Sequence, residues 1–145
     1  SKRSIVHDSY KEAENVLSKK ELSFLLSDKC FREVPVSGSI DLSHLNADFK
    51  IEEMTFNGRL DCLYVTDNEV LIIDFKTDSN VPKTMETINI NYVAQLQVYK
   101  LILKKAYPNR ILKTGIIWTK SATFMSVDLD KMSDDLSKYF LSASS

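Results

Sequence analysis

Two short apolar segments joined by a polar tetrapeptide constrain the fold of this chain more than any other feature. Residues 60–65 and 70–75 are rich in aliphatic and aromatic side chains, and Thr66-Asp67-Asn68-Glu69 separates them. The central Asp-Asn suits a two-residue turn, so the segments predict a β-hairpin. Residues paired across a symmetric hairpin have numbers with a constant sum, which is 135 if Asp67 and Asn68 form the turn. Asp61 is then expected directly opposite Asp74.

This register brings two carboxylates together inside an otherwise apolar sheet. Cross-strand partners have Cβ atoms about 4.5–5.5 Å apart on one face, where like charges repel each other. A divalent cation would compensate that repulsion. Lys76 is expected beside the acids, because side chains two residues apart share a face of a strand. The same alternation puts four residues on the acid face and six on the other: Leu63, Val65, Val70 and Ile72, against Leu60, Cys62, Tyr64, Leu71, Ile73 and Phe75.

The charged residues of the hairpin allow two interpretations. Gly58-Arg59-Leu60-Asp61 followed by Asp74-Phe75-Lys76 has the order of a metal-dependent nuclease centre. Alternatively, the two acids are strand-end carboxylates neutralised by Arg59 and Lys76. The same tripeptide recurs as Asp48-Phe49-Lys50 without an opposing acid, and that copy is expected in an exposed strand or loop. The forced pairing of acids in an apolar sheet favours the metal site at Asp61 and Asp74.

The composition is that of an ordinary soluble globular domain. The chain has 145 residues, a net charge of −1 and 43% hydrophobic residues, enough for one core. No apolar run approaches the roughly 20 residues that span a bilayer, and no secretory signal is evident. Cys30 and Cys62 are expected as buried thiols of a cytoplasmic protein, because their number and spacing suit neither a disulfide framework nor a metal cluster.

A basic stretch follows the acid pair. Residues 87–127 contain no Asp or Glu but include six cations, Lys100, Lys104, Lys105, Arg110, Lys113 and Lys120. These cations would give salt-sensitive affinity for nucleic-acid phosphates. The alternative is a solvated helix face followed by a strand edge.

Hydrophobic periodicity predicts helices packed against one sheet, an α/β (α+β-like) fold. A helix is expected over residues 8–26, with Leu22, Phe24, Leu25 and Leu26 among its core contacts. Further strands are expected over 31–40, 49–56, 110–119 and 124–127. A long helix should begin at 85 or 89 and end at 106, before Pro108, and a terminal helix should cover 129–141. The whole chain is expected to form a single domain.

Five motifs in order carry a family resemblance. The chain resembles the C-terminal nuclease domain of AddA, in the AddAB/RecB-like helicase–nuclease family of the PD-(D/E)XK superfamily. The similarity runs from about Phe31 to Val127 and rests on Glu33-Val34-Pro35-Val36, Gly58-Arg59-Leu60-Asp61, Ile73-Asp74-Phe75-Lys76-Thr77, Tyr92-Val93-Ala94-Gln95-Leu96-Gln97-Val98-Tyr99, and Tyr107-Pro108 with Ile117-Trp118-Thr119. It implies a restriction-endonuclease-like core, with a central mixed sheet flanked by helices.

The resemblance also implies roles for individual residues. Asp61, Asp74 and the backbone carbonyl of Phe75 would hold Mg²⁺ or Mn²⁺, and Lys76 would be the catalytic lysine. It would either activate the attacking water or neutralise charge at the phosphate. Gln95 and Tyr99 match a Gln-x-x-x-Tyr element, and their spacing puts them on one helix face together with Tyr92. Packing on the sheet is the alternative for both tyrosines.

Three further positions are candidates for roles near the acid pair. Glu33 is a candidate third acid of the site, or else a surface charge on an edge strand. Gly58 would allow close backbone approach to a phosphate. Arg59 would face Lys76 in strict register, so either the strands diverge there or both cations face an anion such as DNA phosphate.

The chain departs from the family pattern in two respects. RecB-like relatives have a further histidine ligand on a helix, which would lie upstream of Ser1, and neither His7 nor His44 matches it. We therefore expect part of a larger helicase–nuclease chain, with weak metal binding or activity by itself. Four cluster-binding cysteines of the AddB and Cas4 relatives are also absent from the sequence.

The resemblance therefore implies a Mg²⁺-dependent DNA exonuclease domain in a bacterial, nucleoid-associated enzyme that processes double-strand ends for recombinational repair. Its partners would be a DNA single strand or duplex end, an AddB-like subunit, and helicase domains of the same full-length chain. ATP binding would reside there, since no Gly-x-x-x-x-Gly-Lys-Ser/Thr loop occurs in these residues. The alternatives are a non-catalytic DNA-binding or docking module of the same fold, or a restriction or Cas4-like nuclease.

Overall fold

A five-stranded mixed sheet forms the centre of the part of the chain that the structure describes. The computed structural model describes residues 19–41, 43 and 53–144. The strands are β1 (Cys30–Ile40), β2 (Met54–Val65), β3 (Glu69–Lys76), β4 (Ile111–Trp118) and β5 (Thr123–Val127). They lie in the order β1-β2-β3-β4-β5, with β3 and β4 parallel and the other pairs antiparallel.

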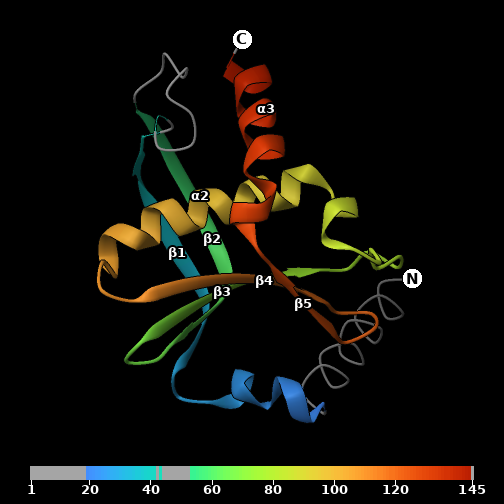
Figure 1. Ribbon diagram of the computed structural model, residues 1–145. Helices are drawn as coiled ribbons and strands as arrows, with labels where there is room; N and C mark the ends of the chain where they lie inside the picture. The colour runs from blue at the N-terminus through green and yellow to red at the C-terminus, as the bar shows by residue number, and fades with distance from the viewer. Residues whose placement is uncertain (1–18, 42, 44–52, 145) are drawn as a thin grey trace, which may run out of the picture.

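Helices cover both faces of this sheet (Figure 1). Helix α2 (Ile90–Ala106) connects β3 to β4 across one face, and α3 (Ser133–Ser144) packs against α2. Three 3₁₀ helices are described: η1 (Lys20–Leu26), η3 (Met85–Thr87) and η4 (Leu129–Met132). The opposite face is covered by η1, whose Leu22 and Leu25 share a small core with Ile73 of β3. The predicted α/β fold with a mixed sheet and flanking helices is confirmed.

Local sequence explains where α2 begins and ends. The side chain of Asn89 accepts a hydrogen bond from the backbone N–H of Asn91, which satisfies a donor left free at the helix start. Pro108 lies two residues beyond the last helical residue, Ala106. Of the two predicted starting points, the one at Asn89 is therefore correct for α2. Residues 85–87 form the separate turn η3.

The predicted hairpin register is confirmed. Pairs from Cys62↔Ile73 to Val65↔Val70 have the expected constant sum. The backbone N–H of Thr66 donates to the carbonyl of Glu69 at 2.9 Å, which closes the turn around Asp67 and Asn68. All four residues predicted on the acid face belong to the core under α2: Leu63, Val65, Val70 and Ile72.

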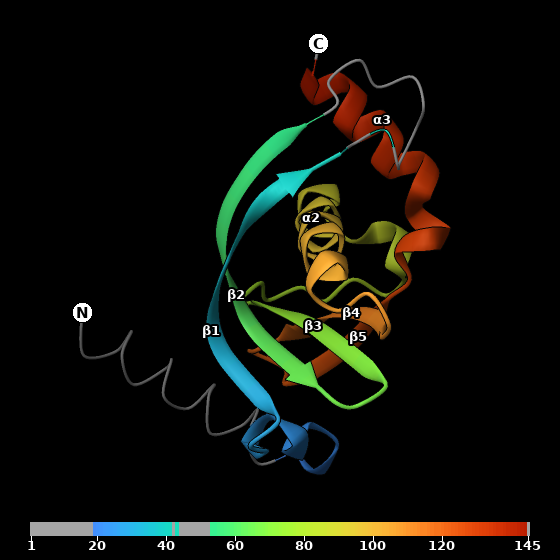
Figure 2. The same ribbon diagram turned by 90° about the vertical axis from the view of Figure 1, so that its left-hand side faces the viewer.

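Leu60 is the exception to the predicted faces. It packs in the core under α2, with Val36 and Tyr99, and not on the opposite face with Cys62. The β1–β2 ribbon is long and curves around α2 (Figure 2). Glu33 stands in β1 at the register position opposite Asp61, and its φ of 50° breaks the regular strand conformation. A regular alternation cannot continue through this bend, so Leu60 and Leu63 face the same core.

The N-terminal prediction is correct only in part. Leu22 and Leu25 are buried as expected, but Leu26 is 68% exposed, because the segment is a 3₁₀ helix with three residues per turn. Residues 8–18, and the tripeptide copy Asp48-Phe49-Lys50, lie outside the described residues. The strand expected over 49–56 is described from Met54, where it forms one continuous strand with the hairpin segment.

No helix in the described ranges is long and apolar enough to cross a membrane.

Candidate active site

The carboxylate of Asp61 lies where β2 and β3 separate. Regular pairing of the two strands ends at Cys62↔Ile73. One residue further, Oδ2 of Asp61 accepts a hydrogen bond of 2.7 Å from the backbone N–H of Phe75. The carboxylate thus takes the place of a backbone acceptor, because the neighbouring strand has moved away. The Asp61 carboxyl is also within hydrogen-bond distance of the Asp74 carboxyl, although regular strand pairing has already ended.

Arg59 does not face Lys76. It pairs with Pro35 of β1, and its guanidinium lies 4.0 Å from the Glu33 carboxylate. Both side chains of this ion pair are largely exposed, 67% and 74%. We expected either that the strands diverge at Arg59 or that Arg59 and Lys76 face a common anion. In the structure the strands diverge.

Asp74 is a buried acid paired with Lys76. Its exposed fraction is 4%, and Oδ2 accepts no hydrogen bond from the described residues, although the ammonium nitrogen of Lys76 lies 2.7 Å away in an ion pair. Burial, followed by hydrogen bonding to the Asp61 carboxyl, raises the pKa of Asp74 to about 6, against the opposing effect of Lys76. Such a carboxyl gains from any further cation placed beside it.

Lys76 is held by three neighbours. Besides the ion pair with Asp74, its Nζ donates to Oε1 of Gln95 at 3.4 Å and lies 4.2 Å from the centre of the Tyr92 ring. The Tyr92 hydroxyl in turn donates to the Asp78 carboxylate, at 3.1 Å from Oδ2. A cation over an aromatic face is stabilised by the ring's electrons. The ammonium group is therefore fixed from the strand and from the helix at once.

Tyr99 stands behind the acid pair. Only 1% of it is exposed, its hydroxyl donates to the carbonyl of Arg59 at 2.9 Å, and its ring packs edge-on against Phe56. Burial and the nearby charge of Asp74 raise the pKa of the Tyr99 hydroxyl, which favours the neutral form that can donate. Through these contacts with Arg59 and Phe56, Tyr99 holds the part of β2 that precedes Asp61.

The space around Gly58 is taken by this packing. A Cβ atom at Gly58 would lie 2.8 Å from the Phe56 ring and 3.0 Å from the Tyr99 hydroxyl. In the structure, the atoms that come close to the Gly58 backbone are those of the Phe56 ring and the Tyr99 hydroxyl. A side chain at this position would collide with them.

The structure brings several of the predicted site residues close together and leaves others apart. The structure gathers Asp61, Asp74, Lys76 and Gln95 at one place, with Tyr99 behind them. Glu33 lies opposite Asp61 on β1, but its carboxylate is 74% exposed and meets Arg59. Asp78 was not identified; its only signal was its position two residues beyond the Asp-x-Lys motif. His7 and His44 lie outside the described residues.

The carboxylates fit a divalent cation. A buried carboxylate in contact with a second carboxylate is the oxygen-rich environment that Mg²⁺ and Mn²⁺ prefer. No group of three or more His, Cys, Asp or Glu side chains suited to a metal occurs within the described ranges. Two carboxylates therefore constitute the side-chain ligands available there, and the other positions would fall to water, backbone or substrate.

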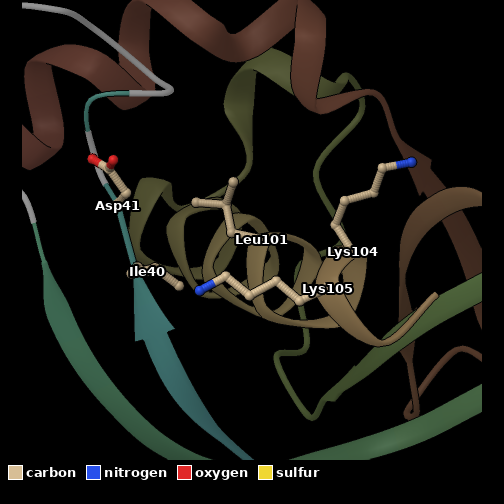
Figure 3. A pocket seen from close by; sticks show the side chains of 5 residues that line it. All are labelled: Ile40, Asp41, Leu101, Lys104 and Lys105. Carbon is tan, nitrogen blue, oxygen red and sulfur yellow. The ribbon is translucent and has the colours of Figure 1, made fainter. Parts of the chain in front are cut away.

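The cations of the basic stretch are spread over several elements. Lys113 pairs with Glu69, Lys104 donates to the carbonyl of Pro108, and Lys105 donates to the carbonyl of Ser39. Lys104 and Lys105 also line a pocket of about 280 Å³ between the end of β1 and α2, together with Ile40, Asp41 and Leu101 (Figure 3). None of the predicted site residues lines this pocket.

Lys120 of the basic stretch lies beside the loop that follows Lys76. Its Nζ donates to the hydroxyl of Ser79, in the loop that follows Lys76, at 3.3 Å. The adjacent Thr119 donates its backbone N–H to the carbonyl of Lys76 at 2.9 Å. One cation of the stretch therefore borders the site, while the others lie on α2, β4 and the turn between them.

Comparison with known families agrees with this geometry. A scan against protein-family models matches residues 7–137 to the PD-(D/E)XK nuclease superfamily. The match covers the five strands, α2 and both acids, and this chain belongs to that superfamily. A search of curated proteins gave no significant match.

Among solved structures, the chain is similar to one described as "Crystal structure of SSO0001". The two are 15% identical over 80% of this chain, with a TM-score of 0.45. The chain spans about half, 55%, of the length of that protein.

Proposed function

We propose that this chain is a nuclease that hydrolyses DNA phosphodiester bonds with the help of Mg²⁺ or Mn²⁺. The observation that carries the proposal is the buried carboxylate of Asp74, which lies between the Asp61 carboxylate and the Lys76 ammonium group. Membership of the PD-(D/E)XK superfamily supports a nuclease. A domain that served only for DNA binding would have no need for two adjacent acids in its sheet.

Each residue of the site has a definite task in this proposal. Asp61, Asp74 and the carbonyl of Phe75 would hold the cation, which polarises the phosphate and lowers the pKa of bound water. Asp61 keeps its orientation through the Phe75 N–H, independently of any ligand. Lys76, fixed by Gln95 and Tyr92, orients the attacking water or neutralises charge on the phosphate. Tyr99 supports the strand that carries Asp61.

We further propose the AddA-like setting for this nuclease. The chain would then act as the exonuclease domain of a cytoplasmic helicase–nuclease that processes double-strand ends, beside an AddB-like subunit and its own helicase domains. The support is the ordered set of motifs, which includes Gln95 and Tyr99 on α2 and the Ile117-Trp118-Thr119 segment at the end of β4. In that setting a further ligand for the cation would come from outside the described residues.

Degradation of single-stranded DNA tests the proposal directly. The chain is incubated with end-labelled oligonucleotides and Mg²⁺ or Mn²⁺, alongside Asp74→Ala and Lys76→Ala. We expect metal-dependent cleavage that falls by about 10²-fold or more in both variants. Undiminished cleavage in both variants would refute the assignment. Metal-independent DNA binding without cleavage, even at high Mn²⁺, would favour the non-catalytic module.

A further inference from the structure

A groove lined by aromatic side chains adjoins the acid pair. It has a volume of about 400 Å³ and lies between the start of β2, helix α2 and helix α3. Its lining includes four aromatic residues and two residues of the candidate site: Phe56, Tyr92, Tyr139, Phe140, Lys76 and Gln95. We call it the aromatic groove. Lys76 and Gln95 belong both to the groove and to the candidate site. A molecule bound at the acids would therefore lie beside the groove.

The four aromatic side chains of the groove differ in their burial and in their contacts with other residues. Tyr92 carries the Lys76 ammonium group over its ring and packs near Trp118, and Phe140 is buried. Phe56 and Tyr139 are half-buried, and each makes one edge-on ring contact, with Tyr99 and Phe140 respectively. Both side chains line the groove and keep part of their surface exposed, so Phe56 and Tyr139 are the rings that a flat ligand in the groove would meet.

A nucleobase is the ligand whose chemistry matches this lining. A phosphodiester placed at Asp61, Asp74 and Lys76 carries bases within one nucleotide of the reacting phosphorus. Every base has a π-face that stacks on aromatic side chains, whatever its sequence. The groove volume lies in the range of ordinary small-ligand sites. The apolar rings suit the base, while Lys76 and Gln95 meet the polar sugar–phosphate side.

We infer that the aromatic groove takes an unpaired nucleobase next to the scissile phosphate, stacked on Tyr139 and Phe56. This inference rests on the proposed nuclease function and narrows its substrate. A base inside a duplex is stacked and paired, and drawing it into a groove costs a few kcal/mol. The substrate is therefore a single strand or a frayed end, and an intact duplex binds less tightly.

Binding of modified oligonucleotides tests the groove apart from catalysis. Fluorescence anisotropy is measured with labelled oligo(dT) and with the same backbone bearing abasic positions, in Ca²⁺ to suppress turnover. Loss of the stacked base should weaken binding to the wild-type chain roughly 5- to 150-fold. Tyr139→Ala should reduce the difference between the two oligonucleotides, because only Phe56 remains for stacking. Tyr139→Phe keeps the ring and should retain the difference.

Two further variants make the result specific. Phe31→Ala removes an aromatic that is 52% exposed on β1 outside the groove, and it should behave as wild type. Tyr139→Leu replaces the alanine variant if that one does not fold, since leucine fills space without a π-face. Equal binding of the two oligonucleotides by wild type, an unchanged difference in Tyr139→Ala or Tyr139→Leu, or no binding at all would overturn the groove assignment.

A parallel cleavage assay separates this inference from the proposed function. Metal-dependent cleavage that is unaffected by abasic positions would support the nuclease function and contradict base binding in the groove. Weaker binding of the abasic oligonucleotide, with no cleavage in the presence of any metal, would support base binding in the groove and contradict the nuclease function. The two failures are therefore distinguishable.

Discussion

Asp61 and Phe75 are joined by a hydrogen bond of 2.7 Å from the backbone N–H of Phe75 to the carboxylate Oδ2 of Asp61. The bond occurs one residue past the last regular β2–β3 pair. The same carboxylate that is proposed to hold a cation therefore also completes the backbone hydrogen bonding of the sheet. Structural and functional effects of Asp61 can be separated by choosing the replacement.

Replacing Asp61 by Asn and by Ala should give different stabilities but the same loss of activity. Asn retains an oxygen acceptor for the Phe75 N–H, so its free energy of unfolding should stay within about 1 kcal/mol of wild type. Ala leaves that N–H unpaired and should cost about 1–3 kcal/mol. Both variants lack the charged ligand. Urea unfolding in EDTA and Mn²⁺ titration measure the two effects, and equal stabilities would contradict the structural role.

Asp74→Asn should stabilise the metal-free protein at neutral pH. The pKa of Asp74 is raised to about 6 from 3.8, so the folded state holds a proton that the unfolded state releases. Stability from this group is present below pH 3.8 and is lost as pH rises through about 6. The loss amounts to at most about 3 kcal/mol. Asn imitates the protonated acid at all pH values and avoids that loss.

Unfolding curves of wild type and Asp74→Asn between pH 4 and 8, in EDTA, measure this difference. The variant should be more stable by about 1–3 kcal/mol above pH 6 and equal to wild type near pH 4. Added Mn²⁺ should stabilise wild type and leave the variant unchanged. A stability difference that does not depend on pH would show that Asp74 is not the titrating group.

Gln95→Leu should impair turnover more than substrate binding. Leucine has similar size but cannot accept the hydrogen bond from Lys76 Nζ, so the ammonium group keeps only its contact with Tyr92 on α2. We expect kcat to fall about 10-fold with KM changed less than about 3-fold, because loss of orientation acts mainly on the chemical step. Lys76→Met is the matched reference and should lower kcat about 10²- to 10⁴-fold. A Gln95 effect confined to KM would place that residue in substrate binding instead.

Tyr99→Phe should weaken the fold while sparing the chemistry. The change removes the hydroxyl that donates to the carbonyl of Arg59 and keeps the ring against Phe56. The expected loss in the free energy of unfolding is about 0.5–1.5 kcal/mol, measured by denaturant titration. Cleavage should persist within a few-fold of wild type. A loss as large as that of Lys76→Met would mean that the Tyr99 hydroxyl itself reaches the substrate.

Gly58→Ala should destabilise the protein through crowding. The new methyl group would meet the Phe56 ring at 2.8 Å, and the glycine has no positive φ that would add backbone strain. Overpacking of this kind costs about 1–3 kcal/mol. Combining it with Phe56→Leu should recover part of that loss, which thermal unfolding of the single and double variants would reveal. Strictly additive losses would rule out the Phe56 contact as the cause.

Local sequence patterns were sufficient to predict the hairpin and, with it, the approach of the two acids. Apolar strands around Asp67-Asn68 allow one symmetric register, and any one-residue slip would reverse every side chain between the two faces. Asp61 opposite Asp74, Lys76 on the same face, and Gln95 one helical turn before Tyr99 follow from local periodicity alone. Those relationships depend only on neighbours along the chain or across one turn.

Features that depend on packing between distant elements could not be predicted from the sequence. The bend at Glu33 and Asp61 carries Leu60 into the core under α2, since the β1–β2 ribbon must curve around that helix. Strand divergence beyond Cys62 gives Asp61 its bond to Phe75 and sends Arg59 to Glu33. The aromatic groove needs β2, α2 and α3 together. Periodicity reports which face a side chain takes on its own element, whereas these features depend on how elements far apart in sequence are packed.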